Sequence, residues 1–323
     1  MFVTHGGVVT HGGDVFAAAR AFGCDWRNVL DFSASINPLG PAAGVRGAIV
    51  ASLDRIAHYP DRYASHLQNA LAELWNVEPE CILLGNGATE LIHFLARTWH
   101  IEATLMTPVF SEFHRAYPNA LLDAPGGDGL LVITNPVNPT GAASHIPDHG
   151  GPILVDESFI EFSDLPTQMH NGHIVLRSLT KFHALPGLRI GALVAPGDLI
   201  KQWRGQREPW QVNVLAEAAA LAAIQAKEHH RITREFVHAE QTRLWDKFRI
   251  LPGVQLSPTH ANFYFARLTY SAATLCQYMR QHRLLLRDCS EWPGIEGQAV
   301  RFAIRTREEN DKLLELWRAF PCD

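Results

Sequence analysis

The stretch Leu130-Leu131-Val132-Ile133-Thr134-Asn135-Pro136-Val137-Asn138-Pro139-Thr140-Gly141 joins an apolar run to a proline-rich turn. The run at residues 130–134 is continuous rather than alternating, which is typical of a strand buried on both faces of a sheet. Two Asn-Pro steps then predict an extended, rigid turn at the carboxyl end of that strand, where α/β sheets bind their ligands. Such a turn can be purely structural, but the amide of Asn138 is well suited to donate a hydrogen bond into the cleft.

Further short apolar runs predict a whole sheet around this strand. We expect other strands at residues 81–84, 104–107, 153–156 and 174–176, a helix at 89–98 and one antiparallel strand at 189–194. Continuous apolar runs of this kind favour a mostly parallel α/β sheet. After residue 213 the pattern changes to helices at 213–225 and 228–249, strands at 262–266, 284–286 and 300–304, and a last helix to residue 320. Thr306 and Glu309 predict a capping box for that last helix, so this part of the chain resembles a smaller α+β domain.

Composition excludes several classes of protein. The 323 residues are 47% apolar and 19% charged, with 28 Lys and Arg against 33 Asp and Glu, so the net charge is −5. Ample apolar content excludes disorder for most of the chain, and the mild acidity makes a nucleic-acid partner unexpected. We expect no membrane span, because no run approaches about 18 apolar residues, and no signal peptide. Five scattered cysteines without a CxxC pair favour a reduced, cytoplasmic protein.

Three more sites have the residue types of a cofactor-binding centre. The loop at residues 85–90 (GNGATE) lies between a strand and a helix, so its glycines and free N–H groups suit a phosphate, although an ordinary glycine turn is the alternative. Asp156 ends an apolar strand, where a carboxylate needs a cationic partner unless it caps a helix. Lys181 lies among apolar residues and hydroxyls, eight residues before Arg189. A desolvated lysine can form a Schiff base, whereas most isolated lysines are surface residues.

The order of these sites along the chain carries a family resemblance. The 85–90 loop, the NPVNPTG turn, Asp156 and the segment at 178–191 (SLTKFHALPGLRIG) follow one another at typical spacings. In this pattern the chain resembles the fold-type I pyridoxal-phosphate enzymes, in the branch of histidinol-phosphate aminotransferase and threonine-phosphate decarboxylase. The resemblance covers essentially the whole chain. It implies pyridoxal 5'-phosphate as cofactor, a phosphorylated amino acid as substrate, and a homodimer with active sites at its interface.

The same resemblance implies the aspartate aminotransferase-like fold. We expect a large, mostly parallel-sheet domain at residues 45–212 and a smaller α+β domain made of 1–44 and 213–323. Two segments, 113–130 and 142–152, are short for the family. The second is too short for a full crossover helix, and both losses are expected at the periphery of the large domain.

The resemblance also assigns cofactor contacts. Lys181 looks like the lysine that binds the cofactor covalently, and Asp156 would pair with the protonated pyridine nitrogen. Asn138 would hydrogen-bond the ring oxygen O3′, and Tyr59 would reach the cofactor phosphate of the neighbouring subunit. The other implied cofactor contacts are the phosphate-binding Gly87, Ala88, Thr89, Ser178 and Arg189 and the ring-stacking Phe110.

Substrate contacts are implied in the same way. Arg301 matches the family's ligand for the substrate α-carboxylate, and Arg287 matches an arginine that grips the substrate phosphate. The implied substrate site also includes His11, Asn138 and Arg305. The 17 histidines show no metal-ligand spacing, so no metal site is expected. Thr-His-Gly-Gly occurs at residues 4–7 and again at 10–13, and only the second copy has the family's downstream sequence.

Three features favour a lyase over an aminotransferase. The segment at 31–40 (DFSASINPLG), after His11-Gly12-Gly13, resembles the amino end of the threonine-phosphate decarboxylases of cobalamin biosynthesis. Phe159 and Arg305 replace the Tyr and Gly that histidinol-phosphate aminotransferases tend to carry. The predicted reaction is decarboxylation of L-threonine O-3-phosphate to (R)-1-amino-2-propanol O-2-phosphate. The alternatives are an aminotransferase acting on histidinol phosphate or a related amino acid, and a non-catalytic binding protein on the same fold.

Overall fold

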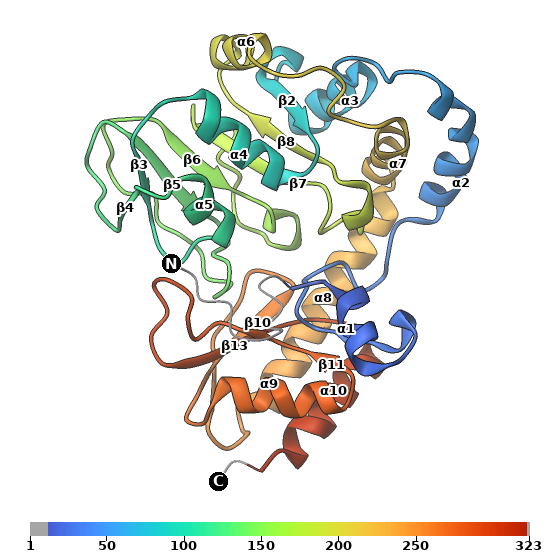
Figure 1. The fold of residues 1–323 in the computed structure, drawn as a ribbon, viewed down its shortest axis with the longest axis vertical. Coiled ribbons are helices and arrows are strands. Elements are labelled where there is room, and N and C mark those ends of the chain that lie inside the picture. The colour runs from blue at the N-terminus through green and yellow to red at the C-terminus, as the bar shows by residue number, and fades with distance from the viewer. Residues whose placement is uncertain (1–11, 322–323) are drawn as a thin grey trace.

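Residues 12–321 are described by the computed structural model, and their largest sheet has seven strands (Figure 1). In spatial order these strands are β2 (Ile82–Gly85), β8 (Gly191–Val194), β7 (Ile174–Ser178), β6 (Ile153–Asp156), β5 (Leu130–Thr134), β3 (Ala103–Leu105) and β4 (Leu121–Leu122). Neighbouring strands are parallel except at β8, which is antiparallel to both β2 and β7. The predicted mostly parallel α/β sheet with one antiparallel strand is therefore confirmed.

Helices cover both faces of this sheet, because each presents an apolar stripe to it. On α4, for example, Leu91 and Leu95 lie four residues apart and are both fully buried. The face that carries Val132 and Leu154 packs against α4 (Ala88–Thr98), α5 (Ser111–Ala116) and α6 (Gly197–Gly205). The opposite face packs against α2 (Ala43–Ala51), α3 (Ser65–Trp75) and α7 (Val214–Ile224).

The connection between β5 and β6 contains no helix, since residues 142–152 form an irregular segment. Ile146 from this segment packs on a small apolar cluster of Leu131, Ile133, Ile153 and Val155. The prediction that this segment is too short for a crossover helix is confirmed. The other short segment, 113–130, holds the end of α5 and the two-residue edge strand β4.

The other described residues include two smaller sheets and the long helix α8 (Lys227–Phe248). The antiparallel sheet has the order β12 (Arg287–Asp288), β13 (Gln298–Ala303), β10 (Phe263–Leu268) and β9 (Val254–Leu256). The parallel pair consists of β1 (Leu30–Asp31) and β11 (Leu284–Leu285). The remaining helices are α1 (Val15–Phe22), α9 (Ala272–Gln281) and α10 (Arg307–Ala319), with 3-10 turns η1 (Trp26–Asn28), η2 (Leu53–Ala57), η3 (Pro79–Cys81), η4 (Ile160–Phe162) and η5 (Pro186–Leu188). The predicted strand at 284–286 is thus replaced by two short strands in different sheets, because residues 284 and 285 pair with the distant N-terminal strand.

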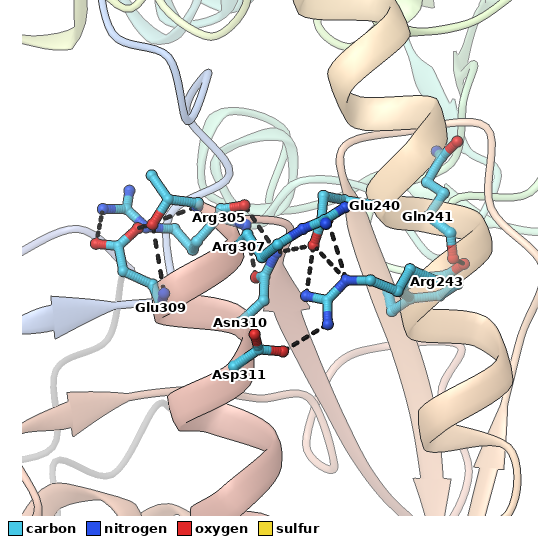
Figure 2. A network of polar contacts seen from close by, with 10 residues as sticks. Glu240, Gln241, Arg243, Arg305, Arg307, Glu309, Asn310 and Asp311 are labelled. Atoms are coloured by element: carbon cyan, nitrogen blue, oxygen red, sulfur yellow. Dashed lines mark hydrogen bonds and ion pairs between the residues drawn. The ribbon is translucent and has the colours of Figure 1, made fainter.

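A polar network centred on the buried Glu240 and Asn310 joins α8 to the start of α10 (Figure 2). Glu240, on α8, is fully buried and accepts hydrogen bonds from Arg243 and Arg307. Asn310 donates to the same carboxylate (2.9 Å) and holds the backbone of Arg305 at both its N–H (2.9 Å) and its C=O (2.7 Å). The capping box predicted for the last helix is present at the start of α10.

The apolar cores cross the predicted domain boundaries in two places. α7, which begins beyond residue 212, packs with α2 and α3 on the large sheet. Phe159, Phe162 and Phe182 join the core formed by α8, α10 and β10. The division into residues 45–212 and the two chain ends stays a prediction. Among the described residues, no helix is both long and apolar enough to cross a membrane.

Candidate active site

The carboxyl ends of β5, β6 and β7 meet at one edge of the large sheet, because the register aligns Thr134, Asp156 and Leu176 across the three strands. Asp156 ends β6, while Asn138 follows β5 and Lys181 follows β7. Strand pairing therefore brings together polar residues that lie far apart in the sequence. This edge is where ligands bind in open α/β sheets.

The amine of Lys181 lies among charged side chains. Burial, together with the cations Arg301 and Arg189, lowers the pKa of Lys181 from 10.5 to about 8. The carboxylates of Asp156 and Asp31 act on this pKa in the opposite direction. A larger fraction of this amine is neutral near pH 7 than in an exposed lysine, which is the form that attacks an aldehyde.

The carboxylate of Asp156 is held at one oxygen. The hydroxyl and the backbone N–H of Ser158 both donate to Oδ1, at 2.5 and 3.0 Å. Within residues 12–321 no hydrogen bond reaches Oδ2, so this oxygen can accept from a ligand. Burial raises the pKa of Asp156 to about 6, although the two Ser158 hydrogen bonds and Lys181 lower it. A cation-bearing ligand beside this group would favour the charged form.

A cradle for an anion lies where α4 begins. Gly87 caps this helix at φ 86°, and a Cβ built on it would lie 2.5 Å from Nη2 of Arg189. A Cβ on Gly191 would lie 2.7 Å from the backbone nitrogen of Ala88, so β8 also approaches this loop closely. The N–H groups at Ala88 and Thr89 belong to the first turn of α4, whose positive dipole end favours an anion. The backbone and Arg189 thus form a cradle suited to an anion such as a phosphate.

Arg301 is oriented from three sides. Its Nη1 donates to Oδ1 of Asn138, its Nη2 donates to the backbone carbonyl of Ser33 at 2.6 Å, and its guanidinium lies 5.2 Å from the ring centre of Phe263. Only 7% of Arg301 is exposed, and burial lowers its pKa to about 10. Because Asn138 uses its oxygen for Arg301, its Nδ2 remains the group that can donate to a cofactor oxygen.

Arg287 and Arg301 face each other across paired strands. The antiparallel register of β12 and β13 places Arg287 directly opposite Arg301. Like charges in this position repel each other, and burial lowers the pKa of both residues. The guanidinium of Arg287 lies 5.2 Å from the ring centre of Trp292. Two opposed cations of this kind are suited to a ligand that carries two anionic groups.

Sequence reasoning assigned no role to Asp31 and Ser33. Asp31 is buried, and the N–H and the hydroxyl of Ser33 donate to its Oδ1 at 2.8 and 2.6 Å. Asp156 and Ser158 form the same arrangement two residues apart. The repeated Asp-x-Ser pattern was the signal in the sequence that could have pointed to Asp31. Both carboxylates raise the pKa of Lys181.

The structure places other predicted contacts less directly. Ser178 ends β7, and its hydroxyl lies 2.7 Å from that of Thr180. Phe110 immediately precedes α5 and is partly buried. Tyr59 is 80% exposed and stacks on Trp210, with ring centres 4.6 Å apart. No described contact joins Tyr59 to the rest of the site, so its reach into a neighbouring subunit stays a prediction.

Two predicted substrate contacts need separate mention. The Nη2 atom of Arg305 pairs with Glu309 at 2.9 Å, and its backbone is held by Asn310, so the structure ties this arginine to α10. A substrate contact by Arg305 therefore stays a prediction. His11 lies outside the described residues.

The residues present fit pyridoxal 5'-phosphate. This cofactor needs an amine for its aldehyde, an anion for its pyridine nitrogen and a cradle for its phosphate. Lys181 supplies the amine, and Asp156 supplies a buried carboxylate with one oxygen available. The close approach of Arg189 to Gly87 supplies the cradle, which a side chain at position 87 would fill.

Comparison with known proteins agrees with this geometry. A family model described as aminotransferase class I and II matches residues 27–316. Threonine-phosphate decarboxylase of Salmonella typhimurium is 34% identical over 95% of this chain and 95% of its own length. Histidinol-phosphate aminotransferase 2 of Archaeoglobus fulgidus is 27% identical over 90% of this chain and 93% of its own.

A solved structure shares the fold. Histidinol-phosphate aminotransferase from Sinorhizobium meliloti, in complex with pyridoxal-5'-phosphate, superposes with a TM-score of 0.83 at 19% identity and covers 95% of both chains. The family match extends over most of this chain, and the site holds the amine, carboxylate and phosphate cradle that the cofactor requires. The chain therefore belongs to the class I and II aminotransferase family of pyridoxal-phosphate-dependent enzymes.

Proposed function

We propose that this enzyme decarboxylates L-threonine O-3-phosphate to (R)-1-amino-2-propanol O-2-phosphate, a step of cobalamin biosynthesis. The observation that carries the proposal is the opposed pair of Arg287 and Arg301, because two desolvated guanidinium groups suit a substrate with a phosphate and a carboxylate. The 34% identity with the Salmonella decarboxylase over nearly the whole chain supports the same substrate.

The residues around the cofactor site have distinct tasks. When bound, pyridoxal 5'-phosphate withdraws electrons from the substrate's α-carbon, so that a bond to this carbon can break. Asp156 would keep the pyridine nitrogen protonated through its available oxygen. Lys181 would bind the cofactor and then move a proton at Nζ, which a pKa near 8 allows at neutral pH.

The two arginines determine which bond breaks. Arg287 would bind the phosphate and Arg301 the α-carboxylate, so together they set the rotation about the α-carbon. The orientation that they impose would favour loss of the carboxylate as CO₂ over removal of the α-proton, which leads to transamination. Because Asn138, Ser33 and Phe263 fix Arg301, the substrate carboxylate would be held in one orientation.

The alternative function is an aminotransferase acting on histidinol phosphate or a related amino acid, as the Archaeoglobus relative's name suggests. Phe159 argues against it, because a phenylalanine has no hydroxyl to donate to O3′. This ring is 5% exposed and packs edge-on against Phe263 at 5.0 Å. A non-catalytic binding protein is disfavoured by the complete set of Lys181, Asp156 and Arg189.

The test is to incubate the purified holoenzyme with L-threonine O-3-phosphate and measure CO₂ release. In parallel, L-glutamate is added and the cofactor absorbance is followed. We expect CO₂ release and no conversion of the cofactor to its amine form. Rapid conversion by glutamate, with transfer of an amino group from histidinol phosphate to 2-oxoglutarate, would establish the aminotransferase instead.

We also propose a homodimer with shared active sites. Large apolar side chains are exposed along the segment from α2 to the start of α3, and Trp210 lies beside them through its stacking on Tyr59. These exposed side chains are Val50, Leu53, Ile56, Tyr59, Tyr63 and Trp210. A second subunit covering this surface would bury apolar area that otherwise contacts water. Sedimentation equilibrium should give twice the 35.9 kDa chain mass; a monomer would contradict the proposal.

A cytoplasmic location completes the proposal. The four described cysteines, Cys24, Cys81, Cys276 and Cys289, are free thiols. Free thiols are expected where the cell keeps cysteines reduced. Fractionation of cells that produce the natural protein tests this location.

A further inference from the structure

The end of β1 forms a tight polar turn. Asp31 is 9% exposed, and its Oδ1 accepts hydrogen bonds from the N–H and the hydroxyl of Ser33 and, at 3.3 Å, from the N–H of Ala34. The backbone before and after Asp31 is also held, because Leu30 pairs with Leu284 in the parallel sheet and the N–H of Phe32 donates to the carbonyl of Leu285 at 2.9 Å. The turn at residues 31–34 is therefore a rigid unit rather than a free loop.

Ser33 uses its remaining groups for two different partners. Its backbone carbonyl accepts from Nη2 of Arg301 at 2.6 Å. Its hydroxyl oxygen, which donates to Asp31, accepts from the backbone N–H of Gly13 at 3.0 Å. Ser33 thus contacts both Arg301, in the candidate substrate site, and Gly13.

Gly12 lies against the same carbonyl group. A Cβ built on Gly12 would lie 2.3 Å from the carbonyl oxygen of Ser33. Only glycine fits here without displacing the oxygen that holds Arg301. Position 12 is therefore coupled to Arg301 through a single backbone atom.

The negative charge of Asp31 supports its role beside Arg301. Burial lowers the pKa of Arg301, and the carboxylate of Asp31 raises it. Asp31 also favours the charged form of Lys181. A carboxylate at this place offsets part of the repulsion between Lys181 and Arg301.

We propose that the turn of Asp31 and Ser33 is a positioning element that holds Arg301 in the orientation required for the substrate carboxylate. Residues 12 and 13 pack against this turn and so help to determine the same orientation. The inference rests on the proposed function only in assigning Arg301 to the α-carboxylate. It predicts that disturbing the turn weakens the binding of amines that carry a carboxylate and leaves the binding of amines without one unchanged.

Four variants test the separate contributions of Asp31, Ser33 and Gly12 to this positioning element. Asp31→Ala removes the acceptor of three hydrogen bonds, and Ser33→Ala removes the hydroxyl between Asp31 and Gly13. Gly12→Ala forces the Ser33 carbonyl to move. Asp31→Asn keeps an oxygen acceptor and removes the charge, so it is the conservative rescue of Asp31→Ala.

The assay is a titration of the holoenzyme with two amines, followed by the change in cofactor absorbance. The first amine is L-threonine O-3-phosphate, and the second is O-phosphoethanolamine, which has the phosphate and the amine but no carboxylate. For Asp31→Ala and Gly12→Ala we expect Kd for the first amine to rise about tenfold, as for the loss of one or two buried hydrogen bonds. We expect Kd for the second amine to change less than about twofold, and Asp31→Asn to recover most of the affinity for the first.

Matched controls are available in the chain. Like Ser33, Ser163 uses its hydroxyl both as a donor, here to a backbone carbonyl at 2.9 Å, and as an acceptor from a backbone N–H at 3.2 Å. Gly44 has nothing within 4 Å of a built Cβ. Ser163→Ala and Gly44→Ala should therefore leave both Kd values unchanged. Binding of O-phosphoethanolamine also shows that each variant has folded with its cofactor site intact.

Two results would overturn the inference. One is an equal loss of affinity for both amines, which indicates general damage to the site; the other is no loss for either. If the wild-type enzyme neither binds nor decarboxylates L-threonine O-3-phosphate, the proposed function is wrong. The same variants are then titrated with L-glutamate and with 1-aminopropane, and the inference stands only if the carboxylate-bearing amine alone loses affinity.

Discussion

Replacing Asp156 by asparagine should stabilise the apoprotein while damaging the enzyme. Burial raises the pKa of Asp156 from 3.8 to about 6, so the folded state binds a proton at this carboxyl more tightly than the unfolded chain does. The free energy of unfolding therefore falls as the pH rises through this window. Well below pH 3.8 both states are protonated and this contribution vanishes.

The pKa gives the size of the effect. A rise in the pKa of Asp156 from 3.8 to about 6 lowers the free energy of unfolding at pH 8 by about 3 kcal/mol. Asparagine has no charge to desolvate, and its side-chain oxygen can still accept from Ser158. Asp156→Asn should therefore raise the Tm of the apoprotein at pH 8 by on the order of 5 °C. The same variant should bind pyridoxal 5'-phosphate less tightly, because no anion then faces the pyridine nitrogen.

Thermal unfolding of cofactor-free protein at pH 4 and pH 8 is the assay. Asp61→Asn is a useful contrast, because the N–H of Tyr63 holds the pKa of Asp61 below its usual value. That variant should be slightly less stable at pH 8, which is the opposite sign. The reasoning is refuted if Asp156→Asn gains no stability at pH 8, or gains the same amount at pH 4.

The other predictions concern the cradle, the amine and the α8–α10 network. Lys181→Ala should abolish the absorbance of covalently bound cofactor and lower kcat by at least about 1,000-fold, and activity near the wild-type level would disprove its role. Gly87→Ala should weaken cofactor affinity at least about tenfold in a fluorescence titration, because a Cβ would meet Arg189 at 2.5 Å. Glu240→Gln should cost about 1 kcal/mol in urea unfolding, because a buried amide accepts fewer of the hydrogen bonds that Arg243, Arg307 and Asn310 donate to the carboxylate. Burial alone would raise the pKa of Glu240, but hydrogen bonds to it prevail and lower the pKa, so its stabilisation should be lost as the pH falls below 4.5.

Most of the large sheet was predictable because each strand is encoded by consecutive residues. The predicted strands at 130–134 and 153–156 coincide with β5 and β6. The strands β1, β4, β9 and β12 were not predicted, since runs of only two or three residues rarely carry a recognisable pattern. Their pairing depends on partners elsewhere in the chain, as the contact of β1 with β11 shows.

The sequence by itself determined the chemical inventory of the site: an amine, a strand-end carboxylate, a glycine loop and arginines, in an order typical of one family. Tertiary structure alone decided which atoms meet. Arg301 contacts Asn138, 163 residues away, and the carbonyl of Ser33, 268 residues away. The physical reason is that a backbone carbonyl is the same in every residue, so only strand pairing and the turn at Asp31 select the one that holds this arginine.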